Sequence, residues 1–210
     1  LNESLHEYFK REALPPVPET YKDSRHVFLA NTHPGGQLKL LSQFPDHKLV
    51  VADTMDLWIE TEQELLKDLL KKIDGLVLND SEAALLTDET NVVRAAEKIA
   101  QMGPKFVVVK KGEHGAIAVM GDEWAALPAF PAGRVIDPTG AGDSFAGGMM
   151  GYLATQDVSD EPRLRTALAF GAVVASFNVE DFSLDRLTQV DRGEIDRRFG
   201  QYRTMLAIAP

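Results

Sequence analysis

The sequence predicts an α/β protein of three layers, with a mostly parallel sheet, helices on both faces and an antiparallel hairpin at one edge. Two observations predict this class. Short apolar runs alternate with amphipathic helical segments over residues 27–102, an order that is typical of a parallel sheet covered on both faces. After residue 109 two short β-prone runs flank a two-residue turn, which indicates the hairpin.

The first half of the chain gives strand and helix signals in turn. Strands are expected at the apolar runs Val27–Ala30, Lys48–Ala52 and Gly75–Leu78. Helices are expected around Gln37–Leu41, over Glu64–Ile73, and over Asn91–Met102, which Gly103-Pro104 closes. Gly35 and Gly36 follow His33-Pro34 and are expected in a plain turn.

The second half begins with a β-prone run over Phe106–Val109. The hairpin follows, with strands Ala116–Met120 and Trp124–Leu127 around the turn Gly121-Asp122. Val135-Ile136 is a short apolar run that suits the end of a buried strand. Helices are then expected to begin just before Asp143 and to cover about Arg163–Phe177 and Gly193–Leu206.

The composition argues against several classes of protein. The 210 residues carry a formal net charge of −10, so most of the surface would repel a nucleic-acid backbone. The absence of cysteine excludes disulfides and thiolate metal sites. No apolar run approaches the length of a membrane span, and no charged-then-apolar N-terminal segment suggests secretion. We therefore expect a cytoplasmic protein without nucleic-acid or membrane partners.

The most informative segment is Asp137-Pro-Thr-Gly-Ala-Gly-Asp143, which leads directly into a helical pattern. The first amides of a helix have no intrahelical acceptor and lie at the positive end of its dipole. Gly140, Ala141 and Gly142 would therefore point three unblocked N–H donors at one anion, and glycine permits the positive φ of such a turn. This segment predicts an anion hole at a helix N-terminus.

Asp143 lies at the same helix start, where the dipole favours its ionised form. Phosphoryl transfer to an alcohol needs donors that stabilise the migrating group and a carboxylate that accepts the hydroxyl proton. We therefore predict that Asp143 is the general base of an ATP-dependent phosphorylation. The simpler alternative is a glycine-rich N-cap in which Asp143 only stabilises the helix, and the length of the motif argues against it.

Asn79-Asp-Ser-Glu82 follows a predicted strand and opens a helix. Open α/β sheets bind ligands at the carboxyl ends of their strands, so these polar groups lie where a ligand would bind. A carboxylate three residues from an amide suits Mg²⁺, which keeps most of its water ligands. Glu82 is thus expected to hold Mg²⁺, directly or through water, although the spacing alone favours a capping box with Asn79 as N-cap.

A second strand leads into Lys110-Lys-Gly-Glu-His-Gly115. Lys110 or Lys111 could offer a point charge to nucleotide phosphates, and Gly112 and Gly115 allow close backbone approach. An exposed, solubilising pair of lysines is an equally good interpretation of the same residues.

The Asp137–Asp143 segment followed by Ser-Phe-Ala-Gly-Gly resembles the C-terminal signature of the ribokinase-like (PfkB) carbohydrate and nucleoside kinases. The resemblance extends from about Val27 to the C-terminus and includes the N-x-x-E pattern of Asn79 and Glu82. It implies a ribokinase-like fold, with Asp143 as the base and Gly140, Ala141 and Gly142 as the anion hole.

The same resemblance implies further binding sites. A monovalent cation, such as K⁺, is expected near Asp137 and Thr139, and adenine near the segment Phe170–Val174, which contains Ala172. Asp53 and Trp58 are expected to line the substrate pocket, although Trp58 is equally consistent with a core position. The spacing of Asp53 and Asp56 differs by one residue from the signature of haloacid dehalogenase-type phosphatases, which is the rival interpretation of this strand end.

The sequence as a whole predicts phosphorylation of a primary alcohol on a sugar or nucleoside, with ATP, Mg²⁺ and, by resemblance, K⁺. Residues 1–22, with Pro15-Pro16-Val17-Pro18, are interpreted as a connector or the remnant of a missing N-terminal part. Residues 23–210 are interpreted as the nucleotide-binding and catalytic part of a single α/β domain. By resemblance the full-length protein is expected to form a homodimer, and the alternative function is a non-catalytic nucleotide-binding fragment that lacks its substrate lid.

Overall fold

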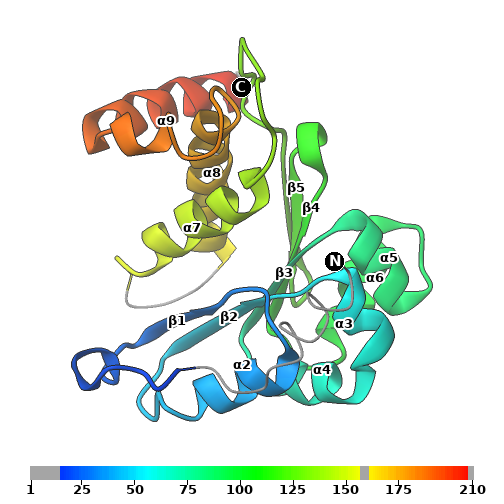
Figure 1. Ribbon diagram of the computed structural model, residues 1–210. Coiled ribbons are helices and arrows are strands. Elements are labelled where there is room, and N and C mark those ends of the chain that lie inside the picture. The colour runs from blue at the N-terminus through cyan, green and yellow to red at the C-terminus, as the bar shows by residue number, and fades with distance from the viewer. Residues whose placement is uncertain (1–14, 157–160, 208–210) are drawn as a thin grey trace. The chain divides into compact units, whose positions relative to one another are not determined.

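The computed structural model describes residues 15–156 and 161–207 (Figure 1). Its strands form one sheet in the order β1-β2-β3-β4-β5-β6. The pairs β1–β2 and β2–β3 are parallel, with Val27 opposite Val50 and Ala52 opposite Leu76. The strands are β1 (His26–Leu29), β2 (Leu49–Asp53), β3 (Gly75–Asn79), β4 (Phe106–Lys110), β5 (Ala116–Met120) and β6 (Glu123–Leu127).

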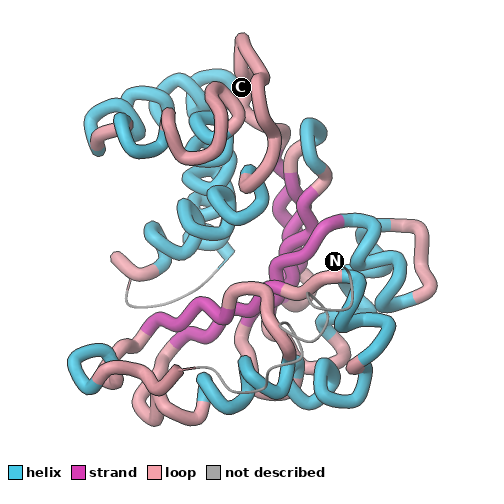
Figure 2. The backbone as a smooth tube through the Cα atoms, in the orientation of Figure 1, coloured by secondary structure: helices cyan, strands magenta, loops and turns pink. Residues whose placement is uncertain are grey.

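Helices precede, connect and follow these strands (Figure 2). The α-helices are α2 (Pro34–Leu41), α3 (Asp56–Thr61), α4 (Gln63–Leu70), α5 (Asp80–Thr87), α6 (Val92–Ala100), α7 (Ala141–Leu153), α8 (Glu161–Asn178) and α9 (Arg192–Leu206). Short 3₁₀ turns are η1 (Glu19–Tyr21), η2 (Gly112–His114) and η3 (Leu187–Gln189). No helix in the described part of the chain is long and apolar enough to cross a membrane.

The chain divides into two compact units, of which the first comprises residues 1–109 and 118–124. Successive side chains of a strand point to opposite faces of the sheet. All five residues of β2 are buried, so both of its faces are covered, as the sequence predicts. The connections between β1, β2, β3 and β4 each contain at least one helix, as parallel pairing requires. Leu29, Val50, Leu76 and Ile99 belong to the apolar core of this unit.

The second unit comprises residues 110–117 and 125–210, and the packing of α7 against α8 dominates it. Gly148 lets the two helices approach, because an added Cβ there would lie 2.8 Å from Val174 Cγ2 and 2.9 Å from the Phe170 carbonyl oxygen. Aromatic rings extend the contact to α9, since Phe170 stacks on Phe199 with ring centroids 4.2 Å apart. The end of α8 is thereby fixed relative to the start of α7.

Most predicted elements are confirmed within one to three residues, including the hairpin β5–β6 around Gly121-Asp122. The predicted strand end at Val135-Ile136 is wrong. These side chains are 64% and 41% exposed, and the Ile136 N–H donates to the Val179 carbonyl, beyond the end of α8, at 2.7 Å. The segment is therefore an extended connection that crosses the surface before α7.

Two further features differ from the sequence predictions. Gly35 and Gly36 lie in the first turn of α2, not in a plain turn, because Pro34 occupies the first helical position and His33 Nδ1 accepts from the Gly35 N–H at 3.0 Å. Helix α3 at Asp56–Thr61 was not predicted, since a six-residue helix leaves too short an amphipathic pattern.

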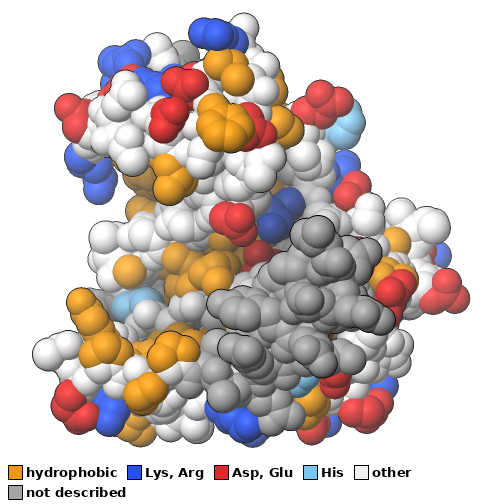
Figure 3. Space-filling model, viewed as in Figure 1, with side chains coloured by type: hydrophobic (Ala, Val, Ile, Leu, Met, Phe, Trp, Pro, Cys, Tyr) orange, Lys and Arg blue, Asp and Glu red, His pale blue; other side chains and the backbone are white. Residues whose placement is uncertain are grey.

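The N-terminal connector is partly described. Residues 1–14 lie outside the described residues, and the turn η1 follows Pro15-Pro16-Val17-Pro18. The Val17 N–H donates to Gln43 Oε1 at 2.8 Å, so the chain is attached to the first unit from this point onward. On the face drawn in Figure 3, acidic and basic side chains are interspersed, and neither sign forms a continuous patch.

Replacing Gly148 by Ala tests the close approach of α7 and α8. We expect Gly148→Ala to lower the free energy of unfolding by about 1–3 kcal/mol, because the added methyl group collides with Val174 and the Phe170 carbonyl. Gly147→Ala is the matched control, since nothing lies within 4 Å of its added Cβ, and it should raise stability by up to about 1 kcal/mol. Urea unfolding measures both, and equal effects of the two variants would contradict the packing.

Candidate active site

The start of α7 depends on the left-handed backbone of Gly140. This residue is the N-cap of α7 and has a φ of 79°, a backbone conformation that residues other than glycine rarely adopt. The turn lets the segment Asp137–Thr139 enter the helix abruptly, and the Ser144 N–H makes the first helical bond, to the Gly140 carbonyl at 2.9 Å. The amides before Ser144 are consequently outside the helical ladder.

The amides of this turn are not equivalent. The Ala141 N–H donates to the Pro138 carbonyl at 3.1 Å, so the prediction of three unblocked donors is wrong at Ala141. Among residues 15–156 and 161–207, no backbone carbonyl accepts a hydrogen bond from the N–H of Gly140, Gly142 or Asp143. The anion-binding capacity of the turn therefore rests on these three amides, with Asp143 replacing Ala141.

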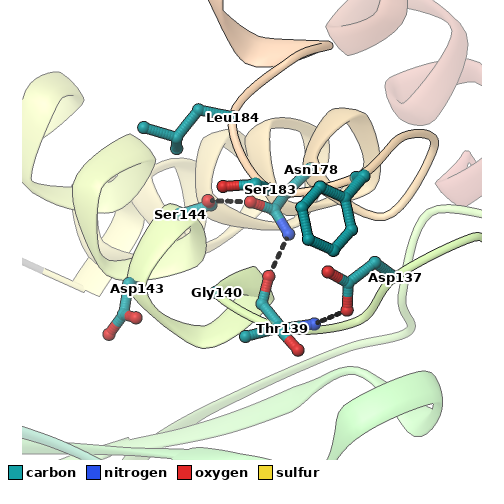
Figure 4. A pocket seen from close by; sticks show the side chains of 9 residues that line it. Asp137, Thr139, Gly140, Asp143, Ser144, Asn178, Ser183 and Leu184 are labelled. Atoms are coloured by element: carbon teal, nitrogen blue, oxygen red, sulfur yellow. Dashed lines mark hydrogen bonds between the residues drawn. The ribbon is translucent and has the colours of Figure 1, made fainter.

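A pocket of about 430 Å³ opens beside the turn (Figure 4). It lies within the second unit, between the start of α7 and the segment that follows α8. The Asp143 carboxylate and the Ser144 hydroxyl leave the first turn of α7 in different directions. The lining residues are Asp137, Thr139, Gly140, Asp143, Ser144, Asn178, Phe182, Ser183 and Leu184.

Asp137 and Thr139 both line this pocket, and their role at a cation site stays a prediction. The Thr139 N–H donates to Asp137 Oδ1 at 2.9 Å. This backbone hydrogen bond, followed by one from the Thr139 side chain, lowers the pKa of Asp137, and the Ser183 backbone contributes in the same direction. The carboxylate is thus maintained in its charged form beside the pocket.

Sequence reasoning missed Asn178, the last residue of α8, whose side chain is 1% exposed. Its Nδ2 donates to the Thr139 carbonyl at 2.8 Å, and its Oδ1 accepts from the Ser144 hydroxyl at 3.0 Å (Figure 4). Both contacts span more than thirty residues of sequence, so no local pattern marks them. The one local signal is a polar residue at the end of the mostly apolar second half of α8.

The segment after α8 supplies Phe182, Ser183 and Leu184 to the pocket and is held by an ionic network. Glu180 bridges two arginines, with Oε1 2.8 Å from Arg198 Nη1 and Oε2 3.4 Å from Arg186 Nε. Both guanidinium groups lie over the Phe177 ring, at 3.5 Å for Arg198 and 5.2 Å for Arg186. Arg186 also pairs with Glu194 of α9. The pocket segment is therefore anchored to α8 and α9.

Lys110 is the predicted lysine that lies at the turn. A Cβ added at Gly142 would be 3.1 Å from Lys110 Nζ, so the ammonium group lies against the start of α7. For Lys111 the described contact is through the backbone, whose N–H donates to the Gly115 carbonyl at 2.7 Å. Lys110 thus adds a positive charge beside the open amides of Gly142 and Asp143.

The two predicted loop glycines differ in their constraints. Gly115 has a φ of 91°, and an added Cβ would lie 2.0 Å from the Leu127 carbonyl oxygen. The close backbone approach expected at Gly115 is therefore made by the chain itself. Gly112 has a φ of 54° with nothing within 4 Å of an added Cβ. Gly112 requires glycine for its backbone conformation alone, and its contact with a nucleotide stays a prediction.

Asn79 and Glu82 form the capping box that their spacing favours. Asn79 Oδ1 accepts from the Glu82 N–H at 2.8 Å, and Glu82 Oε2 accepts from the Asn79 N–H at 2.7 Å. These residues belong to the first unit, whereas the pocket belongs to the second. The described residues contain no group of three His, Asp or Glu side chains arranged to hold a metal ion.

The remaining predicted residues are buried. Asp53 ends β2, where its Oδ1 accepts from the Thr54 N–H at 2.8 Å. Trp58 is a core residue, and its Nε1 donates to Asn31 Oδ1 at 2.9 Å. Ala172 lies within α8 and is also buried. The substrate role of Asp53 and the adenine contact of Ala172 stay predictions.

Comparisons with known proteins place the chain in one family of kinases. Residues 39–189 match the family model described as pfkB family carbohydrate kinase. A cytidine kinase from Thermococcus kodakarensis is 33% identical over 155 residues, which cover 71% of this chain and 55% of that protein. The chain spans less than two thirds of the length of the curated relatives that it matches.

Solved structures show the same fold. The nucleoside kinase of Methanocaldococcus jannaschii, an archaeal member of the ribokinase family, aligns with a TM-score of 0.72 and 25% identity, covering 93% of this chain and 60% of that one. The ribokinase of Arabidopsis thaliana, solved with ribose and ATP, aligns with a TM-score of 0.73 and 21% identity, covering 90% of this chain and 61% of that one.

Proposed function

We propose that this chain, which belongs to the pfkB family of carbohydrate kinases, supplies the nucleotide-binding and catalytic part of an ATP-dependent kinase. The proposed acceptor is a primary alcohol of a sugar or nucleoside. The similarity to a cytidine kinase and to a ribokinase solved with ribose and ATP supports this acceptor class and this donor.

The turn at Gly140–Asp143 is the observation that carries the proposal. It combines open amides at Gly142 and Asp143, the Lys110 ammonium beside them, and a carboxylate at the same helix start. Positive charge and bare N–H donors stabilise the oxygens of a transferring phosphoryl group, and the carboxylate can accept a proton. The Lys110 ammonium group beside these amides supports anion binding over a glycine-rich cap that only stabilises α7.

Each group of the site has one role in the proposed reaction. The acceptor hydroxyl oxygen attacks the γ-phosphorus of ATP, a new O–P bond forms, and the bond to the β-phosphate oxygen breaks to release ADP. Asp143 takes the hydroxyl proton, while the amides of Gly142 and Asp143 and the Lys110 ammonium stabilise the charge on the migrating group. Asp143 is thus the catalytic residue, and the turn provides the electrostatic stabilisation.

The proposed cofactors are Mg²⁺ and K⁺. Glu82 offers a carboxylate at the start of α5, and a carboxylate suits a cation that keeps most of its own waters, as Mg²⁺ does. Mg²⁺ would neutralise phosphate charge when bound. Asp137 and the Thr139 hydroxyl offer oxygen ligands of the kind that a monovalent cation accepts. Gly112 and Ala172 are the proposed contacts of the rest of the nucleotide, and Asp53 that of the acceptor.

Removing the proposed base should lower turnover without weakening nucleotide binding. In the complete protein, Asp143→Asn should lower kcat by roughly 10²- to 10⁴-fold while the affinity for ATP changes little, because only the proton acceptor is lost. Asp196→Asn is the control, since it removes the same charge from an exposed ion pair with Arg192 on α9. ADP release with a panel of sugars and nucleosides measures both. A near-normal kcat for Asp143→Asn would contradict the role of Asp143 as the general base. If the wild-type protein binds nucleotide but transfers no phosphoryl group, the non-catalytic alternative is favoured.

The two adjacent lysines should contribute unequally. Lys110→Met should weaken binding of an ATP analogue by roughly 10- to 100-fold, the effect of losing one charge-assisted hydrogen bond. Lys111→Met should change the dissociation constant by less than about twofold, because the described contact of Lys111 is made by its backbone. Isothermal titration calorimetry compares the two, and an equal loss for both variants would show that Lys110 has no specific role.

A further inference from the structure

Asn178 makes contacts that the proposed reaction does not yet use. Its side chain is buried at the end of α8, and both of its polar atoms face the turn before and within α7. A backbone carbonyl only accepts hydrogen bonds, so the amide nitrogen of Asn178 must be the atom that faces Thr139. The orientation of the side chain is therefore determined by chemistry, with Oδ1 left to accept from the Ser144 hydroxyl.

The contact with Thr139 fixes a whole peptide group. The peptide between Thr139 and Gly140 is planar and trans, so its carbonyl and its N–H point in opposite directions. Because Asn178 holds the Thr139 carbonyl at 2.8 Å, the Gly140 N–H is directed away from Asn178. In the described part of the chain no backbone carbonyl accepts a hydrogen bond from that N–H. Asn178 thus determines which group of this peptide remains available to a ligand.

The second contact fixes the other side of the turn. Asn178 Oδ1 accepts from Ser144, one residue after Asp143, at 3.0 Å. A Cβ added at Gly140 would lie 3.4 Å from the same oxygen, so the side chain also lies directly against Gly140. One buried amide therefore connects the residues immediately before and after the segment Gly140–Asp143.

We propose that Asn178 is a positioning residue for phosphoryl transfer. It holds the Gly140–Asp143 turn so that the open amides and the Asp143 carboxylate of this turn face the same phosphoryl group. This inference rests on the proposed kinase function. Asn178 acts through the turn and not on the substrate, so its loss should lower kcat with little effect on the KM of the acceptor.

Asn178→Asp is the sharpest test, because it keeps the shape and the acceptor for Ser144 but replaces the donor by an oxygen that repels the Thr139 carbonyl. In the complete protein we expect kcat to fall by about 10- to 100-fold, with the acceptor KM within about twofold of wild type. Ser144→Ala should lower kcat by a smaller factor, because the Thr139 carbonyl remains held. Melting temperature and near-ultraviolet circular dichroism report whether both variants fold.

The pH profile of Asn178→Asp separates positioning from general destabilisation. Protonation of the introduced carboxylate restores an O–H donor for the Thr139 carbonyl, so the ratio of variant to wild-type kcat should rise as pH falls. The other titratable groups that line the pocket, Asp137 and Asp143, are present in both proteins and largely cancel in this ratio. A ratio that stays constant with pH, or a variant kcat within about twofold of wild type, would overturn the role of Asn178. Absence of transfer by the wild-type protein would instead overturn the kinase proposal on which it rests.

Discussion

The left-handed backbone of Gly140 is the constraint on which the candidate site depends. At a φ of 79° Gly140 turns the chain directly into α7, whose first amides, including those of Gly142 and Asp143, have no intrahelical acceptor. Lys110 lies against the same turn, and Asp143 extends from it. A side chain at Gly140 would both strain this conformation and come within 3.4 Å of Asn178. The backbone of Gly140 therefore sets the direction in which the chain enters α7 at the site.

The rest of the second unit fixes that turn in place. The close packing of α7 and α8 at Gly148 brings the end of α8 to the start of α7, which is where Asn178 can reach both Thr139 and Ser144. Beyond α8, the pairing of Glu180 with two arginines secures the segment that completes the pocket. Apolar packing and ionic contacts therefore have separate roles, since the first positions the helices and the second positions the pocket wall. A rigid support of this kind is what preorganised electrostatic stabilisation requires.

Local patterns accounted for much of the fold and for part of the site. Apolar runs predicted the strands, and the spacing of Asn79 and Glu82 predicted the capping box, because each depends on residues a few positions apart. Val135-Ile136 was misassigned, since apolar residues in an exposed connection leave the same pattern as a strand end. The Ala141 amide was wrongly expected to be free, because a turn bond to Pro138 leaves no compositional trace. Asn178 was missed since its partners lie 34 and 39 positions away in the sequence. Hydrogen bonds between residues far apart in the sequence could not be predicted from local patterns.

The proposed mechanism requires the open amides at the start of α7 to hold the migrating phosphoryl group. A crystal structure of the complete protein with an ATP analogue, Mg²⁺ and an acceptor alcohol tests it most directly. We expect the terminal phosphate oxygens to lie within hydrogen-bonding distance of the Gly142 and Asp143 nitrogens, with Lys110 Nζ beside them and the acceptor hydroxyl facing the Asp143 carboxylate. Terminal phosphates bound elsewhere, with these amides facing only solvent, would contradict it.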